Sequence, residues 1–294
     1  MRKSLTILLS LCVITVFALS FSAQPVLQAR GGVTPENIPW NRHPSRTTTV
    51  EFSATPAGEG EVSATALPKL ALIIGISDYA GTSNDLNYCD DDALEVRDTL
   101  VQKYGFSSSN ITLLLDTEAT DANIRAGIEW LITNSGPDSH VVFWYSGHGS
   151  RSNKNMDDDP ERQDECIIPH ELSRIWDGEL ANYFAQVTSN YFWIGFDSCY
   201  SGGMDDITNK APAGKVLTMA CGEGEYSYES SSIGHGYFTW LMVEEGMRLG
   251  KGDANGDGIV SVEEGFTYCK NNIKSYSKRQ NPVMVDGVSG ELVP

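Results

Sequence analysis

Apolar runs that alternate with segments of helical periodicity constrain the fold of this chain more than any other feature. Residues 70–76 (LALIIGI) form a continuous apolar run, which is typical of a strand buried on both faces of a sheet. Further strands are predicted at 111–115, 141–145, 191–196, 216–220 and 283–285, and helices at about 93–104, 124–132, 177–187 and 237–249. This alternation predicts an α/β fold, a three-layer α/β/α sandwich with a mostly parallel sheet.

Residues 1–67 differ in composition from the rest of the chain. Residues 1–23 combine Arg2 and Lys3 with an apolar run and small residues, which predicts a signal peptide and a secreted or extracytoplasmic protein. The run barely reaches the roughly 20 residues that a bilayer span needs, so no stable membrane anchor is expected after signal removal. Residues 24–67 are rich in Thr, Ser, Pro, Gly and Ala and predict a disordered linker or pro-segment. Residues 68–294 then form one domain.

The formal net charge of −18 argues against nucleic acid and anionic membrane surfaces as partners. Acidic residues cluster in loops, which favours metal ions or basic peptides as ligands. Beyond the apolar leader, cysteines stand at positions 89, 166, 199, 221 and 269. An odd number without dense spacing does not fit a disulfide framework, so at least one thiol is expected to be free unless the chain dimerises through it.

Two predicted strands end in glycine-rich loops that carry a histidine and a cysteine. Strand 141–145 runs into YSGHGS, which contains His148, and strand 191–196 runs into FDSCYSGG, which contains Cys199. The carboxyl ends of parallel strands share one edge of a sheet, where reactive residues gather. A thiolate nucleophile needs a neighbour that protonates the leaving amine, and glycines expose backbone N–H groups for an oxyanion. The loops therefore predict a catalytic pair, with a structural histidine and an inert cysteine as the alternative.

From residue 69 onward the chain resembles caspase-like cysteine peptidases of the metacaspase branch. The matching segments are LALIIGISDY, LNYCDDDALEVRDTL, VVFWYSGHGS, QDECIIPHE, GFDSCYSGG and GHGYFTWLM. True caspases carry Gln-Ala-Cys around the nucleophile, which this chain lacks, and Tyr200 stands where the commoner metacaspase form has histidine. The resemblance implies a caspase-haemoglobinase fold and a thioester acyl-enzyme. In that mechanism Cys199 attacks the peptide carbonyl, His148 handles the proton, and the N–H groups of Gly149 and Cys199 hold the oxyanion.

The resemblance also implies a specificity pocket for Arg or Lys before the scissile bond. The matching positions are Asp92, the last of three consecutive aspartates, and Asp197, two residues before Cys199. Paired carboxylates suit a guanidinium or ammonium group. For Asp92 the residues alone leave a helix N-cap as an equal alternative. For Asp197 a buried, uncompensated carboxylate would be costly, which favours a cationic ligand.

Two sets of oxygen ligands suggest calcium. The stretch DANGDGIVSVEE has EF-hand spacing, and an Asp/Gly turn that binds nothing is the alternative. Its predicted ligands are Asp253, Asn255, Asp257, Ile259 (through its carbonyl), Ser261 and Glu264. A second, activating site follows only from the resemblance, at Asp164, Asp177 and Asp206, with solvated loop carboxylates as the alternative. A further acid found in some relatives is Gly178 here.

Together these features predict a secreted cysteine endopeptidase that cleaves peptide or protein substrates after Arg or Lys by a Cys-His dyad. A catalytically silent caspase-like module that binds calcium or a partner is the alternative, but such a module would be free to lose His148 or Cys199. A thiol hydrolase of non-peptide acyl bonds fits the same residues. The remaining histidines, His235 among them, are predicted to be structural.

Overall fold

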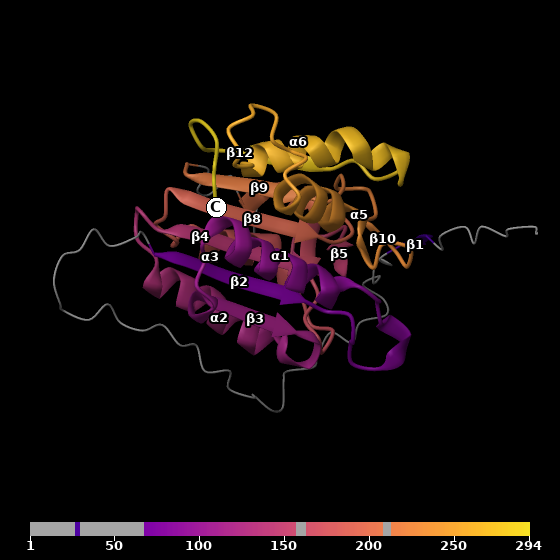
Figure 1. Ribbon diagram of the computed structural model, residues 1–294. Coiled ribbons are helices and arrows are strands. Elements are labelled where there is room, and N and C mark those ends of the chain that lie inside the picture. Colours follow the sequence, from indigo (N-terminus) through magenta and orange to yellow (C-terminus); the bar gives the residue numbers. More distant parts are fainter. Residues whose placement is uncertain (1–26, 30–67, 157–162, 208–212) are drawn as a thin grey trace, which may run out of the picture.

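The computed structural model describes residues 27–29, 68–156, 163–207 and 213–294. Its centre is a six-stranded sheet in the order β12-β9-β8-β4-β2-β3 (Figure 1). The strands are β2 (Lys69–Gly75), β3 (Ile111–Leu115), β4 (His140–Ser146), β8 (Tyr191–Asp197), β9 (Lys215–Met219) and β12 (Val283–Asp286). In this sheet β3, β2, β4, β8 and β9 run parallel to one another, and β12 is antiparallel to β9. The predicted mostly parallel sheet is confirmed.

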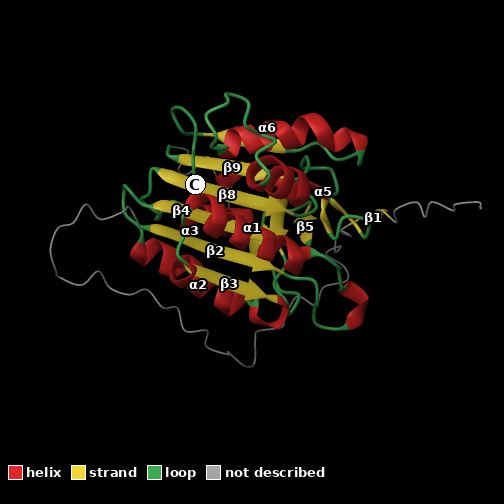
Figure 2. Cartoon of the chain, in the orientation of Figure 1, coloured by secondary structure: helices red, strands yellow, loops and turns green. Residues whose placement is uncertain are grey.

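Helices cover both faces of this sheet, as Figure 2 shows. One face carries α1 (Cys89–Tyr104), the short helix α5 (Tyr237–Thr239) with the π-helical segment Trp240–Arg248, and α6 (Val262–Asn272). The other face carries α2 (Asp121–Asn134) and α3 (Asp177–Phe184). A separate apolar core fills each of the two interfaces between sheet and helices. The three-layer α/β/α architecture is therefore confirmed as well.

The N-caps of the helices decide whether Asp92 has a capping role. Thr120 caps α2, as the sequence indicates. At α1 the capping group is the Ser77 hydroxyl, which accepts hydrogen bonds from the backbone N–H groups of Cys89 (2.9 Å) and Asp90 (3.3 Å). Asp92 lies inside the first turn of α1 and is not its N-cap. The capping alternative for Asp92 is therefore wrong, and its carboxylate must be explained by other contacts.

Two small antiparallel sheets, which apolar periodicity did not predict, lie at the carboxyl edge of the main sheet. One contains β5 (Gly149–Ser152), β6 (Asp164–Ile167) and β7 (Ile175–Trp176). The other contains β1 (Leu27–Ala29), β10 (Tyr228–Ser230) and β11 (His235–Gly236). In chain order β5 follows β4, and β10 follows β9. Both small sheets are thus added at the edge where the two predicted catalytic loops begin.

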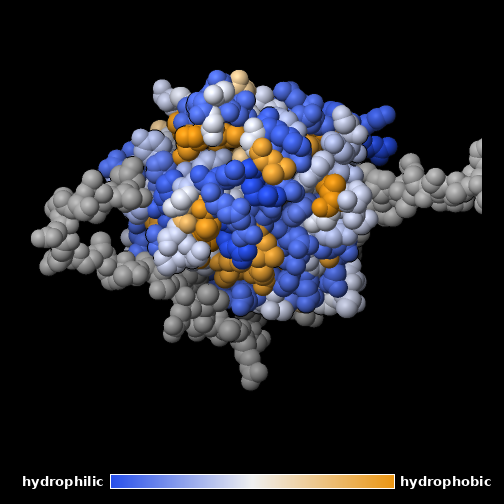
Figure 3. Space-filling view, viewed as in Figure 1, coloured by the Kyte–Doolittle hydropathy of each residue, from blue (hydrophilic) through white to orange (hydrophobic). Residues whose placement is uncertain are grey.

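The predicted signal peptide, residues 1–23, lies outside the described residues, as does most of the predicted pro-segment. Three residues of that segment form β1. Among the residues that the structure describes, no helix has the length and apolar character needed to cross a membrane. The face of the molecule in Figure 3 is mainly hydrophilic, with scattered apolar patches.

Candidate active site

His148 and Cys199 lie on loops that leave two neighbouring strands at the same level. β4 and β8 pair in parallel, with Ser146 beside Asp197, and the two predicted catalytic residues each follow that pair by two positions. Gly149 approaches the second loop so closely that a Cβ atom on it would lie 2.0 Å from the carbonyl oxygen of Cys199. Only glycine allows this approach, so the fold brings the two loops into direct contact.

Backbone groups fix the imidazole of His148. The ring is buried, and its Nε2 lies 2.7 Å from the carbonyl oxygen of Asn84. Because a carbonyl only accepts, Nε2 carries the proton and Nδ1 is the basic nitrogen. Tyr79 packs against the ring at 4.7 Å between centroids, and its hydroxyl accepts the backbone N–H of His148 at 2.7 Å. Asn84 is a positioning residue that the sequence did not reveal, since every residue has a carbonyl.

The loop that carries Cys199 turns sharply after this residue. The Cys199 thiol is fully buried, and its Sγ lies 3.8 Å from the carbonyl oxygen of Ser227. Tyr200 adopts a left-handed backbone conformation (φ 60°), which is uncommon for a residue other than glycine. Its N–H donates to the carbonyl of Glu225 at 2.8 Å, and the guanidinium of Arg151 lies 4.8 Å from its ring centre. These contacts hold the turn next to the sulfur atom.

The described residues contain five cysteines, and no disulfide joins any of them, in agreement with the expectation that at least one stays unbridged. Burial raises the pKa of Cys221 to about 12. Burial also raises the pKa of Cys166 and of Cys269. A thiol that keeps its proton at neutral pH is a poor nucleophile. These three cysteines therefore act as small apolar side chains of the core.

Asp92 is fully buried and accepts hydrogen bonds from two strands, β4 and β11. One carboxylate oxygen accepts from the backbone N–H of Gly236 at 3.0 Å and from Nδ1 of His235 at 3.1 Å. The other accepts from the hydroxyl of Ser146 at 2.8 Å. Since Ser146 stands beside Asp197 in the sheet, Asp92 is linked through one side chain to the start of the nucleophile loop.

Asp197 is also fully buried, and donors surround both of its oxygen atoms. Oδ1 accepts from the hydroxyl of Ser227 at 2.6 Å. Oδ2 accepts from the backbone N–H and the hydroxyl of Thr239, at 3.1 and 2.6 Å. These donors lie on the segments that contain β10 and α5, which the sequence did not connect with the site. They hold a carboxylate in place without neutralising its charge.

His235 contacts the site although its sequence context did not indicate this. Burial acts to lower the pKa of His235, but the hydrogen bond and charge of Asp92, with Glu244 and Glu95, outweigh burial and raise that pKa above its ordinary value. A carboxylate oxygen of Glu95, a ring nitrogen of His235 and a carboxylate oxygen of Glu244 lie within 4.8 Å of one another. Arg248 pairs with both glutamates. The cationic Arg248 thus offsets part of the negative charge of the glutamates beside His235 and Asp92.

The predicted EF-hand loop folds with its acidic side chains turned onto its own backbone. The Asp253 carboxylate accepts from the N–H groups of Gly256 and Gly258 at 2.7 and 3.0 Å. Gly258 has φ +87°, which suits the sharp turn at the sixth position of such a loop. Ser261 and Glu264 form a capping box at the start of α6. The predicted calcium ligands thus lie along one short loop, and calcium binding there stays a prediction.

The second predicted calcium set comes from three elements that meet in the fold. Asp164 begins β6, Asp177 begins α3, and Asp206 follows a 3₁₀ turn. β6 contacts both α3 and this turn. Asp164 and Asp177 are fully buried, as is Glu165, an acid that the sequence did not single out. The donors at this place are carboxylate oxygens, which hard cations prefer.

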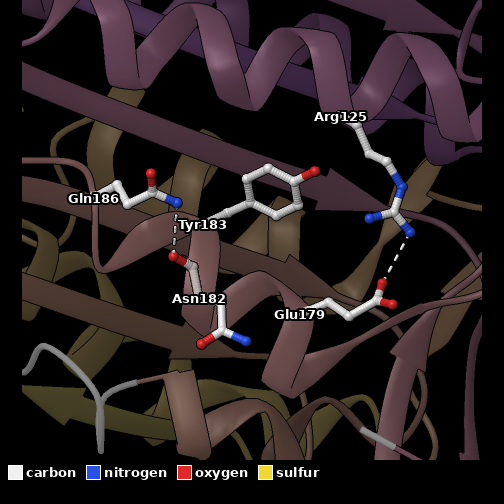
Figure 4. Close-up of a pocket in the computed structure, with 5 residues that line it drawn as sticks. All are labelled: Arg125, Glu179, Asn182, Tyr183 and Gln186. Carbon is white, nitrogen blue, oxygen red and sulfur yellow. Dashed lines mark hydrogen bonds and ion pairs between the residues drawn. The ribbon is translucent and has the colours of Figure 1, made fainter.

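A separate pocket of about 240 Å³ lies at α2 and α3 (Figure 4). It is lined by Arg125, Glu179, Asn182, Tyr183 and Gln186. Arg125 and Glu179 form an ion pair across it, at 2.8 Å. No residue of the two glycine-rich loops lines this pocket, so it is distinct from the candidate active site.

An α/β/α sandwich that brings a His-Gly loop and an Asp-Ser-Cys loop together at one sheet edge has the arrangement of a caspase-like cysteine peptidase. Residues 69–208 match the family described as "Metacaspase, peptidase C14 domain". The chain belongs to this family, whose class is that of cysteine-type endopeptidases.

Relatives agree with this assignment, and one solved structure has a similar fold. The chain is similar to Metacaspase-4 of Arabidopsis thaliana, with 32% identity over 67% of this chain and 50% of the relative. It is similar to Metacaspase-1 of Plasmodium falciparum, with 30% identity over 76% of this chain and 40% of the relative. The chain thus spans half or less of the length of these two proteins. Its fold is similar to that of protein GSU0716 from Geobacter sulfurreducens, with a TM-score of 0.57 and 17% identity over 77% of this chain and 97% of that structure.

Proposed function

We propose that this protein is a secreted cysteine endopeptidase that cleaves peptide bonds after Arg or Lys, with Cys199 as nucleophile and His148 as acid–base group. One observation carries the proposal: the loops of both residues touch at Gly149, next to two fully buried carboxylates. The apolar leader at residues 1–23 supports export from the cytoplasm.

The chemistry follows from the groups at the sheet edge. The thiolate of Cys199 attacks the carbonyl carbon of the scissile bond, and the N–H groups of Gly149 and Cys199 stabilise the oxyanion. His148, which takes up the thiol proton through Nδ1, returns a proton to the leaving amine. Water then hydrolyses the thioester and regenerates the thiol. The hydrogen bond to Asn84 keeps the imidazole in the tautomer that these proton transfers require.

The charge of the pocket supports the choice of substrate. Asp92 and Asp197 are both buried and both hydrogen-bonded by neutral donors, apart from His235 at Asp92. A substrate guanidinium or ammonium supplies the positive charge that these carboxylates favour. An acidic substrate side chain would add a like charge to them. The pocket thus favours Arg and Lys and disfavours Asp.

A digest of a peptide library tests this proposal. Cleavage should occur after Arg or Lys, and iodoacetamide should stop it while labelling Cys199, as read by peptide mapping. If the protein is instead a catalytically silent calcium-binding module, no peptide should be cleaved. A hydrolase of non-peptide acyl bonds predicts turnover of esters or thioesters with peptides left intact.

We also propose that calcium binds the loop from Asp253 to Glu264 and stabilises the domain. The loop connects the π-helical segment to α6, which pack against each other. A ligand that binds only the folded state stabilises it by about 2.7 kcal/mol at a hundredfold excess over its Kd. The second set, Asp164, Asp177 and Asp206, is proposed as an activating calcium site on the basis of the family resemblance.

Chelation of calcium is expected to lower the Tm of the protein, as measured by thermal denaturation with and without EDTA. Glu264→Gln should remove most of this response, because Gln keeps the capping box but lacks the bidentate carboxylate. The exposed Glu291 provides a control, and Glu291→Gln should respond as the unaltered chain does. Equal melting curves with and without EDTA for the unaltered chain would exclude a stabilising ion at this loop.

A further inference from the structure

Three side chains that are able to ligate a metal ion meet beside Asp92. Glu95 lies one turn after Asp92 on α1, His235 begins β11, and Glu244 lies on the π-helical segment. α1 packs against β11 and against this segment, which continues α5 in the chain, and Figure 1 shows α1 and α5 on the same face of the sheet. One donor atom from each of the three side chains lies within 4.8 Å of the other two. The fold thus gathers an imidazole and two carboxylates from three separate elements.

Asp92 fixes the orientation and the tautomer of the His235 ring. Nδ1 lies 3.1 Å from Oδ1 of Asp92. Because a carboxylate only accepts, Nδ1 of the neutral ring carries the proton and Nε2 keeps its lone pair. Nε2 lies on the side of Glu244, 3.9 Å from its Oε2. A carboxylate that holds one ring nitrogen while the other nitrogen faces further ligands is the usual support of a metal-binding histidine.

The charges around His235 favour a divalent cation. Asp92 and the two glutamates bring three negative charges, and Arg248 brings one positive charge, which it shares between Glu95 and Glu244. Arg248 contacts Oε1 of each glutamate, whereas Oε2 of Glu244 is the oxygen that lies near the ring of His235. Arg248 thus holds both glutamates in place and leaves this oxygen facing the imidazole. With a neutral imidazole, two further positive charges balance the group.

We propose that Glu95, His235 and Glu244 bind a divalent transition-metal ion of the zinc class, with Asp92 holding the imidazole from the other side. Zn²⁺ binds imidazole nitrogen and carboxylate oxygen, whereas Ca²⁺ and Mg²⁺ take oxygen ligands. The donor set therefore separates this site from the two proposed calcium sites. His235, predicted to be structural, becomes a metal ligand in this proposal.

The spacing of the donors fits such an ion after a small closure. Two ligands of a tetrahedral zinc ion lie about 3.4 Å apart at bond lengths of about 2.0–2.2 Å. His235 and Glu244 lie 3.9 Å apart, and no pair of the three has to close by more than about 1.4 Å. The Glu244 side chain is 24% exposed, so it can rotate and ions from solvent can reach it. Water completes the coordination at the fourth position.

The ion joins three segments that surround the candidate pocket. Its ligands come from α1, β11 and the π-helical segment, so the site exists only in the folded chain, and binding should raise the Tm. A metal on Nε2 also keeps the proton of His235 on Nδ1, where it donates to Asp92. The ion therefore acts as a structural support for the Asp92 carboxylate.

Isothermal titration calorimetry of the full chain with Zn²⁺ tests the site. The chain carries Cys199→Ala, which removes the thiol that would compete for zinc next to His148, and calcium is present in excess to fill the oxygen sites. The pH is mildly alkaline, because a metal-binding imidazole has to be neutral. A single equivalent of Zn²⁺ should bind, and the Tm should rise with it. Absence of binding would overturn the proposal.

Variants of the ligands locate the bound ion. His235→Gln and Glu244→Gln should each weaken Zn²⁺ binding by about a hundredfold or more, because each removes one of three protein ligands. Two matched controls alter the same residue types elsewhere. His170→Gln changes a histidine that hydrogen-bonds outside the cluster, and Glu245→Gln changes the neighbour of Glu244, which pairs with Lys251. Both controls should bind Zn²⁺ as the parent chain does, and equal binding by His235→Gln would overturn the site.

A change at Arg248 distinguishes a metal site from a plain ion-pair network. Arg248→Gln removes a positive charge next to the ligands, so Zn²⁺ should bind about tenfold more tightly or better, with the Tm recorded to confirm that the variant is folded. Unchanged or weaker binding would show that the ion does not lie beside Arg248 and would overturn the site. Because binding is read in a chain without the Cys199 thiol, the outcome is independent of the proposed peptidase activity.

Discussion

Replacing Cys199 with alanine is expected to lower kcat/KM for a peptide with Arg before the scissile bond by roughly 10⁴–10⁶-fold. Alanine has no group that can form the thioester, so only binding and oxyanion stabilisation remain. The measurement is hydrolysis of a fluorogenic Arg peptide, with the Tm recorded for each variant. Retention of activity within tenfold of the unaltered chain by a folded Cys199→Ala protein would exclude Cys199 as the nucleophile.

Further variants test whether the loss is specific to Cys199 and whether Cys199 and His148 act in the same step. Cys269 is a buried cysteine of α6 that belongs to neither glycine-rich loop, and Cys269→Ala should keep activity close to that of the unaltered chain. His148→Ala should lose activity by an amount similar to Cys199→Ala. The double variant should lose little more than either alone, because residues that act in one step do not contribute additively. A fully additive double variant would indicate that the two residues serve separate steps.

The main sheet could be predicted because its strands are long, apolar and separated by helices. The run 70–76 and the strands that end before His148 and Cys199 all carry this pattern, and parallel strands necessarily align their carboxyl ends. The meeting of these two residues at one edge therefore followed from the sequence. Gly149 was expected to offer its N–H to an oxyanion, and its close approach to the Cys199 carbonyl is visible only in the fold.

The short strands around the site could not be predicted in the same way. β10 has three residues and β11 has two, which is too short for alternation between two faces to be recognised. Yet β11 carries two residues that bind Asp92, and Ser227, which binds Asp197, lies immediately before β10. The contact of His235 with Asp92 joins positions 143 apart in the chain, and no local pattern encodes such a distance. The role of Asn84 could not be predicted for another reason, because Asn84 acts through its backbone carbonyl.

The same short strands explain why Asp92 was ambiguous in the sequence. Three consecutive aspartates at the start of a helix match a capping pattern, and helix N-termini favour negative charge. In the structure the Ser77 hydroxyl takes the capping role, which leaves Asp92 to bind Ser146 and Gly236. A residue that is first in a helix by sequence can thus belong to a site by tertiary contact. Only the fold separates these two functions.

Replacing Asp197 with asparagine is expected to lower cleavage after Arg by roughly 10²–10⁴-fold, because the substrate guanidinium would be buried with one charged partner missing. Asparagine is the better choice than alanine for a first test. Asp197 accepts three hydrogen bonds, from Ser227 and Thr239, and the amide oxygen preserves part of this network. Asp92→Asn should show a loss in the same direction, since the other carboxylate would then face the substrate cation alone.

The decisive measurement for Asp197 is the ratio of the cleavage rates of two substrates rather than a single rate. Each variant should be assayed on two fluorogenic peptides that differ only before the scissile bond, one with Arg and one with citrulline, which is uncharged and nearly the same shape. Damage to the fold or to the Cys199 loop lowers both rates equally and leaves their ratio unchanged. Loss of a pocket charge lowers the Arg rate alone, so the ratio should fall by about the full 10²–10⁴-fold. If the ratio for Asp197→Asn equals that of the unaltered chain, Asp197 does not bind the substrate cation. The nucleophile would then stand without this pocket, and the preference for Arg and Lys would need another source of negative charge.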